Sequence, residues 1–166
     1  MKIICEGIKN GVFEDKYGFR GECNELGMPI HSIPLRFEDA PEGTESFAVV
    51  LEDKDAYPVS GGFAWIHWLA ANIKKNELLE NESQTAADFV QGINSWFSVQ
   101  GGSHPAESCS YYGGMAPPNE PHTYEVHVYA LDKVLDLENG FMLHDLHRQM
   151  RGHILAQGTI YGEYSN

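Results

Sequence analysis

Short apolar runs separated by turn residues make up most of the chain. Gly, Pro, Asn and Asp recur about every ten positions, and the runs between them are rich in Val, Ile, Phe, Tyr and Trp. This spacing is typical of all-β sandwiches and barrels. We predict strands at residues 46–52, 63–73, 96–99, 123–131 and 159–164.

A helical period replaces this pattern near the C-terminus. In FMLHDLHRQMRG, residues 141–152, apolar Met142, Leu146 and Met150 share one helical face, and Gly152 can end the helix. We predict one helix here, packed against the sheets, and a second helix over residues 84–91. No repeat, linker or low-complexity tract divides the chain, so residues 1–166 are expected to form a single domain.

The predicted strand at 63–73 carries a histidine between two tryptophans. Because alternate residues share a face, Trp65, His67 and Leu69 should point one way, and Trp68 and Ala70 the other. Both faces are apolar, which indicates a central strand in which His67 is buried. Taken alone, such an imidazole is most simply a core residue hydrogen-bonded to a backbone carbonyl.

Another predicted strand, otherwise largely apolar, also has polar residues at its start. In PPNEPHTYEVHVYALD, residues 117–132, His122 and Tyr124 share one strand face. If this strand end lies beside that of the first, one small pocket would be lined by Asp53, His67, His122 and Tyr124. A carboxylate near an imidazole favours the imidazolium, which together with a phenol O–H could bind an oxyanion such as a phosphate monoester.

The acidic charge balance excludes two classes of partner. The chain has 24 acidic and 11 basic residues, a formal net charge of -13, which repels nucleic acids and anionic lipid surfaces. No apolar run reaches the length of a signal peptide or a membrane span, so we expect a cytoplasmic protein without stable membrane association. The three cysteines lack C-x-x-C spacing and predict neither a disulfide framework nor a zinc motif.

The order of four segments resembles the phosphatidylethanolamine-binding protein (PEBP) family, in its bacterial and archaeal, Raf-kinase-inhibitor-like branch. APEGTESFAVVLEDKDA, residues 40–56, is similar to the family's Pro-x-Gly-Thr-x-Ser-Phe segment and the acidic loop after it. WIHWLAANI, residues 65–73, resembles the strand with the pocket histidine. YYGGMAPPNEPHTYEVHVYALD, residues 111–132, matches a Tyr-Gly-Gly stretch, a Pro pair and His-x-Tyr, and GHILAQGTIYGEY, residues 152–164, resembles the C-terminal segment.

The resemblance implies a β-sandwich with a large central antiparallel sheet, a smaller flanking sheet and a C-terminal helix. It also implies an anion-binding pocket at one end and a regulatory or scaffold role, similar to kinase inhibition, without catalysis, cofactor or metal. The expected partners are a small anionic or phosphorylated ligand, a phosphoprotein and a second copy in a homodimer. By motif position the ligand-binding residues are Asp53, Asp55, Trp65, His67, Pro117, Pro118, His122 and Tyr124.

Two residues depart from the family pattern at the rim of this expected pocket. Lys54 replaces a proline in the acidic loop, and Thr123 stands where a basic residue is frequent. We interpret Lys54 as a solvated side chain rather than an anion ligand.

An enzyme is the alternative. The chain has no G-x-S-x-G, H-E-x-x-H, Walker or G-x-G-x-x-G motif. Asp53, His67 and His122 could instead form a two-histidine, one-carboxylate metal site, which would make the protein a metal-dependent hydrolase or lyase. His127 could not join it, because it lies five residues after His122 and so on the opposite strand face.

Overall fold

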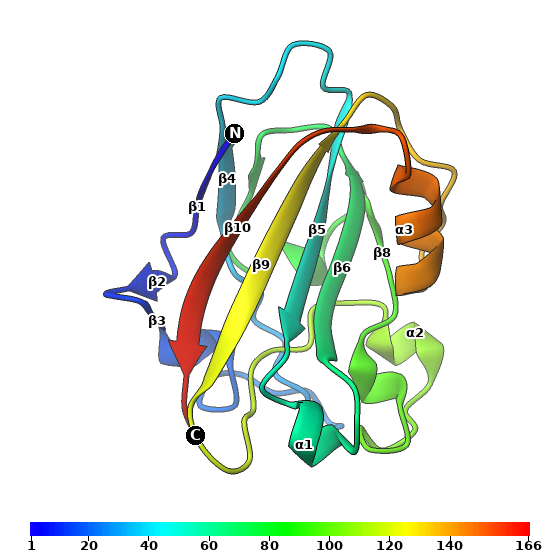
Figure 1. The fold of residues 1–166 in the computed structure, drawn as a ribbon. Helices are drawn as coiled ribbons and strands as arrows, with labels where there is room; N and C mark the ends of the chain where they lie inside the picture. The colour runs from blue at the N-terminus through cyan, green and yellow to red at the C-terminus, as the bar shows by residue number, and fades with distance from the viewer.

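Two β-sheets form the body of the protein in the computed structural model, which describes all of residues 1–166 (Figure 1). The larger sheet has seven strands in the order β2-β3-β10-β9-β5-β6-β8, and the smaller has three in the order β1-β4-β7. The strands are β1 (Lys2–Ile4), β2 (Ile8–Lys9), β3 (Val12–Phe13), β4 (Leu35–Glu38), β5 (Ser46–Asp53), β6 (Trp65–Ile73), β7 (Glu77–Leu78), β8 (Val90–Gln91), β9 (His122–Leu131) and β10 (Ile154–Tyr164). The helices are α1 (Tyr57–Ser60), α2 (Ala106–Cys109) and α3 (Leu143–Met150), with 3-10 turns η1 (Asp15–Tyr17), η2 (Glu82–Gln84) and η3 (Ser95–Phe97).

The long strands of the larger sheet run antiparallel at its centre. β5 lies between β9 and β6, and the centre of its sequence SFAVVLED is an unbroken apolar run, FAVVL, because both of its faces are covered there. The mainly β sandwich and four of the five predicted strands are therefore confirmed, as β5, β6, β9 and β10.

Different layers cover the two faces of the larger sheet. The smaller sheet covers one face, where Phe37 of β4 joins Val49 of β5 and Val126 of β9 in the main core. α3 covers the other face, where Leu146 and Met150 join a second core cluster. The predicted C-terminal helix is thus confirmed. α3 is the longest helix at 8 residues, so no helix could cross a bilayer.

Two predicted elements are wrong. Residues 96–99 are not a strand, because Asn94 accepts the Trp96 N–H with its side chain at 3.0 Å and starts the 3-10 turn η3. Residues 84–91 are not a helix. The chain there leaves η2, and Val90 and Gln91 pair with Ala71 and Ala70 as the edge strand β8. Edge pairing with β6 outweighs the weak helical pattern.

A β-bulge in β6 also changes the predicted side-chain alternation. Leu51 of β5 pairs with Trp68 and Glu52 pairs with Ile66, so His67 is an extra residue in β6. As a result His67 lies on the side of the main core, as Trp68 does, while Leu69 lies on the α3 side. The prediction that His67 and Leu69 share a face is wrong, because regular alternation does not hold across a bulge.

Candidate ligand-binding pocket

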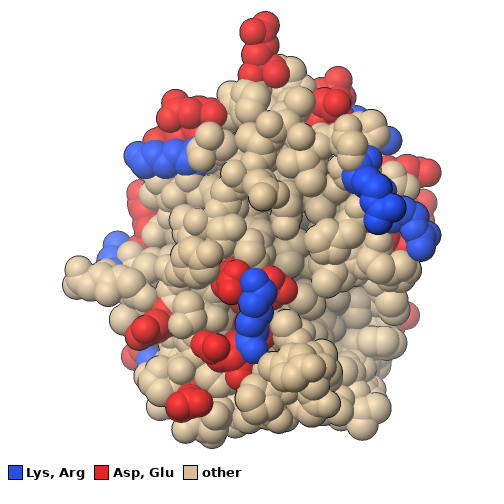
Figure 2. Space-filling model, viewed as in Figure 1, with Lys and Arg blue, Asp and Glu red and all other residues tan.

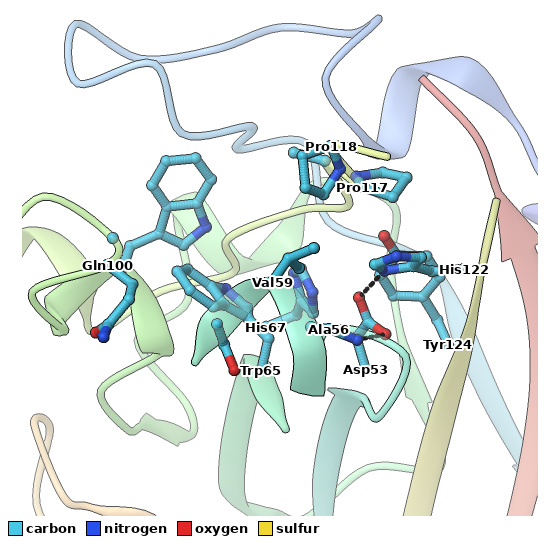
Figure 3. A pocket seen from close by; sticks show the side chains of 14 residues that line it. Asp53, Ala56, Val59, Trp65, His67, Gln100, Pro117, Pro118, His122 and Tyr124 are labelled. Atoms are coloured by element: carbon cyan, nitrogen blue, oxygen red, sulfur yellow. Dashed lines mark hydrogen bonds and ion pairs between the residues drawn. The ribbon is translucent and has the colours of Figure 1, made fainter. Parts of the chain in front are cut away.

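A cavity of about 230 Å³ opens where β5 ends and β6 and β9 begin (Figure 3). Its walls come from these strands, from α1, from η3 and the segment after it, and from the loop before β9. The residues that line it are Asp53, Ala56, Val59, Ser60, Trp65, His67, Trp96, Gln100, Gly101, Ala116, Pro117, Pro118, His122 and Tyr124.

Strand pairing brings the predicted polar residues together. Asp53 at the end of β5 pairs with Trp65 on one side and Tyr124 on the other, so the three side chains form one row. His122 lies two residues before Tyr124 on the same face of β9. The bulge adds His67, whose ring centroid is 5.1 Å from that of Tyr124. The adjacency that the sequence predicted for Asp53, His67, His122 and Tyr124 is therefore present.

A buried hydrogen bond between Asp53 and His122 forms the floor of the pocket. Nδ1 of His122 is 2.7 Å from Oδ2 of Asp53, with only 1% and 4% of the two side chains exposed. The other Asp53 oxygen accepts the Ala56 N–H at 3.0 Å, and Nε2 of His122 is 3.0 Å from Oδ1 of Asn119. Both ring nitrogens of His122 are thus engaged by the protein, and its imidazole is held in place as part of the wall.

His67, unlike His122, has one ring nitrogen without a hydrogen-bond partner. Its Nδ1 donates to the carbonyl oxygens of Gly113 and Gly114 at 2.6 and 3.0 Å, as expected for a core histidine, while its buried Nε2 has no partner. Burial lowers the pKa of His67, and the Asp53 carboxylate offsets only part of this effect. The imidazole is therefore neutral at neutral pH, and the free Nε2 is an acceptor. Burial does not favour the imidazolium that the sequence predicted.

Two further polar atoms of the pocket are buried without a hydrogen-bond partner, as Nε2 of His67 is. The Trp96 Nε1–H and the Tyr124 hydroxyl are buried without a partner; the backbone of Ala116 lies near that hydroxyl but outside hydrogen-bonding geometry. Burial raises the pKa of Tyr124, so the phenol keeps its proton. Only one other buried side-chain atom in the protein is unpartnered, Oδ1 of Asn81. Three of the four thus belong to residues that line one pocket.

Apart from Ser60 and Gln100, the remaining side chains of the walls are apolar. Phe63 and Trp65 are stacked with centroids 5.9 Å apart, and Trp96 meets Trp65 edge-on at 6.1 Å. Pro117 and Pro118 form the opposite wall (Figure 3). No Lys or Arg lines the cavity, so no permanent positive charge is available to a ligand.

The structure places two residues of the acidic loop outside the pocket. Asp55 does not line the cavity; its carboxylate accepts the Thr123 N–H at 2.8 Å and joins the loop to β9. Lys54 also lies outside the pocket and is exposed, as interpreted from the sequence; its ammonium group is 2.8 Å from Glu125 and 3.3 Å from Glu52, on the opposite face of the sheet.

Sequence reasoning missed the part of the pocket that loops supply. Trp96, Gln100 and Gly101 come from η3 and the segment after it, and Val59 comes from α1. No local signal distinguishes these residues, because their position depends on how the loops pack on the sheet.

The metal-site alternative gains no support from the geometry. Asp53 and His122 already satisfy each other, and Nδ1 of His67 is held by two carbonyls. The one set of side chains with three ligand atoms within 4.8 Å of one another is Glu52, Glu125 and His127, on the opposite face of the sheet, and its two glutamates also contact Lys54.

Comparisons with known proteins agree with this architecture. A family model described as phosphatidylethanolamine-binding protein matches residues 6–165. The chain is 43% identical over 165 residues to the uncharacterised protein YxkA of Bacillus subtilis, covering 96% of each chain. It is 34% identical over 144 residues to a UPF0098 protein of Chlamydia muridarum, covering 86% of this chain and 85% of that protein.

Solved structures have the same fold. The crystal structure of CT736 from Chlamydia trachomatis, a PEBP homologue, superposes with a TM-score of 0.79 at 28% identity, covering 99% of this chain and 96% of that one. Escherichia coli YbcL superposes with a TM-score of 0.76 at 24% identity, covering 99% and 98%.

Proposed function

The chain belongs to the phosphatidylethanolamine-binding protein family, and we propose that its pocket binds a small oxyanion, best matched by a phosphate group that carries one proton. The observation that carries the proposal is that three unpartnered buried atoms, Nε2 of His67, the Tyr124 hydroxyl and Nε1 of Trp96, belong to residues that line one pocket. Buried polar groups without partners are rare in proteins, and a ligand that satisfies them stabilises the site.

The chemistry of the three atoms specifies the ligand. Trp96 N–H and Tyr124 O–H are donors and suit two anionic oxygens. Neutral His67 offers a lone pair at Nε2, which needs a hydrogen from the ligand. A singly protonated phosphate monoester supplies both the oxygens that accept from the two donors and the hydrogen that Nε2 of His67 needs. A fully ionised phosphate would meet the buried Asp53 carboxylate without any Lys or Arg to offset the repulsion.

The proposed role is capture rather than catalysis. Ser60 is the only hydroxyl side chain other than Tyr124 in the lining, and its Oγ already donates to the Phe63 carbonyl at 2.6 Å and accepts the Phe63 N–H at 3.0 Å. No nucleophile with an adjacent base faces the cavity. We therefore propose a regulatory or scaffold protein that holds a phosphate group carried by a small molecule or by a phosphorylated protein.

A comparison of two probes tests the proposal. Methyl phosphate at about pH 6 carries a mobile proton, whereas methyl sulfate has a similar shape and a single negative charge without an O–H. In amide-resolved NMR titrations we expect methyl phosphate to shift residues of the pocket saturably and methyl sulfate to bind at least about tenfold more weakly. Affinity for methyl phosphate should fall as pH rises above about 6, because the ligand loses the proton that His67 accepts.

Variants complete the experiment. His67→Ala should abolish the shifts, and His144→Ala, an exposed histidine of α3, should leave them unchanged. Equal binding of both probes would show that His67 donates as an imidazolium and would overturn the protonated-ligand proposal. Absence of binding by either probe would overturn the oxyanion function itself.

A further inference from the structure

One histidine and two glutamates meet on the face of the larger sheet opposite the pocket. Glu52 of β5 pairs directly with Glu125 of β9, and His127 lies two residues further along β9 on the same face. Val50 of β5 still packs in the cluster beneath α3, so the three residues lie where this cover ends. Figure 2, from the viewpoint of Figure 1, shows a basic side chain among acidic ones on the lower part of this face.

The three side chains have the spacing of a metal site. Nε2 of His127 is 3.0 Å from Oε1 of Glu52 and 3.4 Å from Oε2 of Glu125. All three atoms lie within 4.8 Å of one another. Zn²⁺ binds such nitrogen and oxygen atoms at about 2.0–2.2 Å in tetrahedral geometry, which separates neighbouring ligand atoms by about 3.4 Å. Small side-chain rotations would therefore suffice to complete the coordination.

A neighbouring strand orients the imidazole for this purpose. Nδ1 of His127 is 2.8 Å from Oγ1 of Thr159, its pairing partner on β10. An Nδ1–H that donates to this hydroxyl leaves the lone pair of the neutral ring at Nε2, where it faces the two carboxylates. Metal-binding histidines are usually held in this way, by a hydrogen bond from the other ring nitrogen. A lone pair directed at two carboxylates needs a cation between them.

Lys54 is the cation that the structure places there. Carboxylates directly opposite each other on antiparallel strands repel. Nζ of Lys54 is 2.8 Å from Oε2 of Glu125 and 3.3 Å from Oε1 of Glu52, the same two oxygens that His127 approaches. The lysine side chain is 56% exposed, and exposed ion pairs of this kind contribute little stability, so the flexible side chain can turn into water.

We propose that Glu52, Glu125 and His127 form a binding site for a divalent transition-metal ion, best matched by Zn²⁺, and that Lys54 takes the cation position when no metal is bound. One nitrogen and two carboxylate donors suit Zn²⁺, whereas Mg²⁺ and Ca²⁺ prefer oxygen ligands alone. The three ligand side chains are 17–18% exposed, which leaves a fourth coordination position to water. The site shares no residue with the phosphate pocket.

Calorimetric titration of the metal-free protein with Zn²⁺ tests the proposal. We expect one ion per chain with a dissociation constant in the micromolar range. His127→Ala and Glu52→Gln should each weaken binding at least about tenfold, because each removes one of three ligands. Lys54→Met should strengthen it about threefold or more, because the stem is kept and the competing ammonium is removed. His144→Ala, an exposed histidine of α3, should have no effect.

Spectroscopy locates the ion. Co²⁺ in place of Zn²⁺ should give the visible absorption of a four-coordinate ion, and His127→Ala should remove it. In NMR spectra Zn²⁺ should shift the amides of Glu125 and His127 and spare those of Trp96 and Gln100, which line the pocket on the other side of the sheet. His67→Ala should leave Zn²⁺ binding unchanged, so failure of the phosphate proposal and failure of the metal site can be distinguished.

Three results would overturn the metal site. Absence of binding by both Zn²⁺ and Co²⁺ would assign the cluster to an ion-pair network closed by Lys54. Binding that survives His127→Ala but is lost in His144→Ala would place the ion on α3 instead. Weaker binding in Lys54→Met would contradict the exchange of the lysine for the metal, since removal of a competitor cannot lower affinity.

Discussion

Tyr124 and His67 each bury a polar atom without a partner, which disfavours the folded state of the free protein. Such groups persist at sites where a ligand supplies the missing contact. In this pocket the same atoms lower the stability of the free protein and contribute to ligand binding. A substitution that removes one of them should therefore keep or raise the free energy of unfolding while it lowers the affinity.

Tyr124→Phe should keep or raise the free energy of unfolding, by up to about 1 kcal/mol, because it removes a buried hydroxyl that has no hydrogen bond. The same substitution should weaken methyl phosphate binding about tenfold. Urea unfolding and an NMR titration measure the two effects.

Tyr112→Phe is the matched control. Its hydroxyl is equally buried but donates to the Tyr17 carbonyl at 2.7 Å, so its removal should cost about 1 kcal/mol of stability and leave affinity unchanged. A loss of stability in Tyr124→Phe equal to that in Tyr112→Phe would show that the Tyr124 hydroxyl is satisfied in the free protein.

At the scale of the element, β6 is a predicted strand whose regular alternation is interrupted twice. Its second register shift lies between the pairs of Phe47 and Val49, where Asn72 has a φ of 62°. The Asn72 side chain also accepts the Leu135 N–H at 2.8 Å and donates to its carbonyl at 3.0 Å. The bulge therefore depends on one residue that tolerates the left-handed conformation.

Replacement of Asn72 should reverse the usual order of stability in a strand. Asn72→Ala and Asn72→Gly both lose the bonds to Leu135, but alanine adds about 1–2 kcal/mol of backbone strain at positive φ. Denaturant unfolding should therefore find the alanine variant less stable than the glycine variant. In the neighbouring control, Ala71→Gly should be destabilising, since Ala71 is buried and has no positive φ. Equal stability of the two Asn72 variants would contradict a strained bulge.

Much of the fold was predictable from periodicity, and the reasons for the failures are local. The apolar run of β5, the alternation of buried residues in β9 and the helical face of α3 depend on patterns that burial imposes over many residues. The bulge at His67 and the short strand β8 depend instead on pairing with neighbours distant in sequence. For the same reason His67 and His122 could be placed in the pocket from their strands, whereas Trp96 could not.

At the scale of the whole molecule, the net charge of -13 opposes the approach of an anion to a pocket without Lys or Arg. Recognition must then depend on hydrogen bonds made after the ligand has left water, rather than on attraction at a distance. This distinguishes the pocket from phosphate sites built on arginine.

Added salt should therefore speed binding instead of slowing it. Between low ionic strength and about 0.15 M, we expect the association rate of methyl phosphate to rise about twofold or more as the repulsion is screened. Glu120→Gln, beside the pocket loop, should reduce this dependence. Glu42→Gln, in the connection before β5 at the other end of the sheet, should reduce it less. A rate that falls with salt would reveal a local positive potential and contradict this account.

The bulge at His67 has a consequence for how this scaffold can vary. An extra residue resets the alternation of side chains in β6. The facing of the row formed by Trp65, Asp53 and Tyr124 is therefore independent of how the residues beyond the bulge pack in the interior. Mutations at the mouth can then accumulate without forcing a compensating change in the centre of the sandwich. The bulge thus divides β6 into a pocket end, where substitutions are tolerated, and a packed end, where they are not. New binding preferences could be selected or engineered at the pocket end alone.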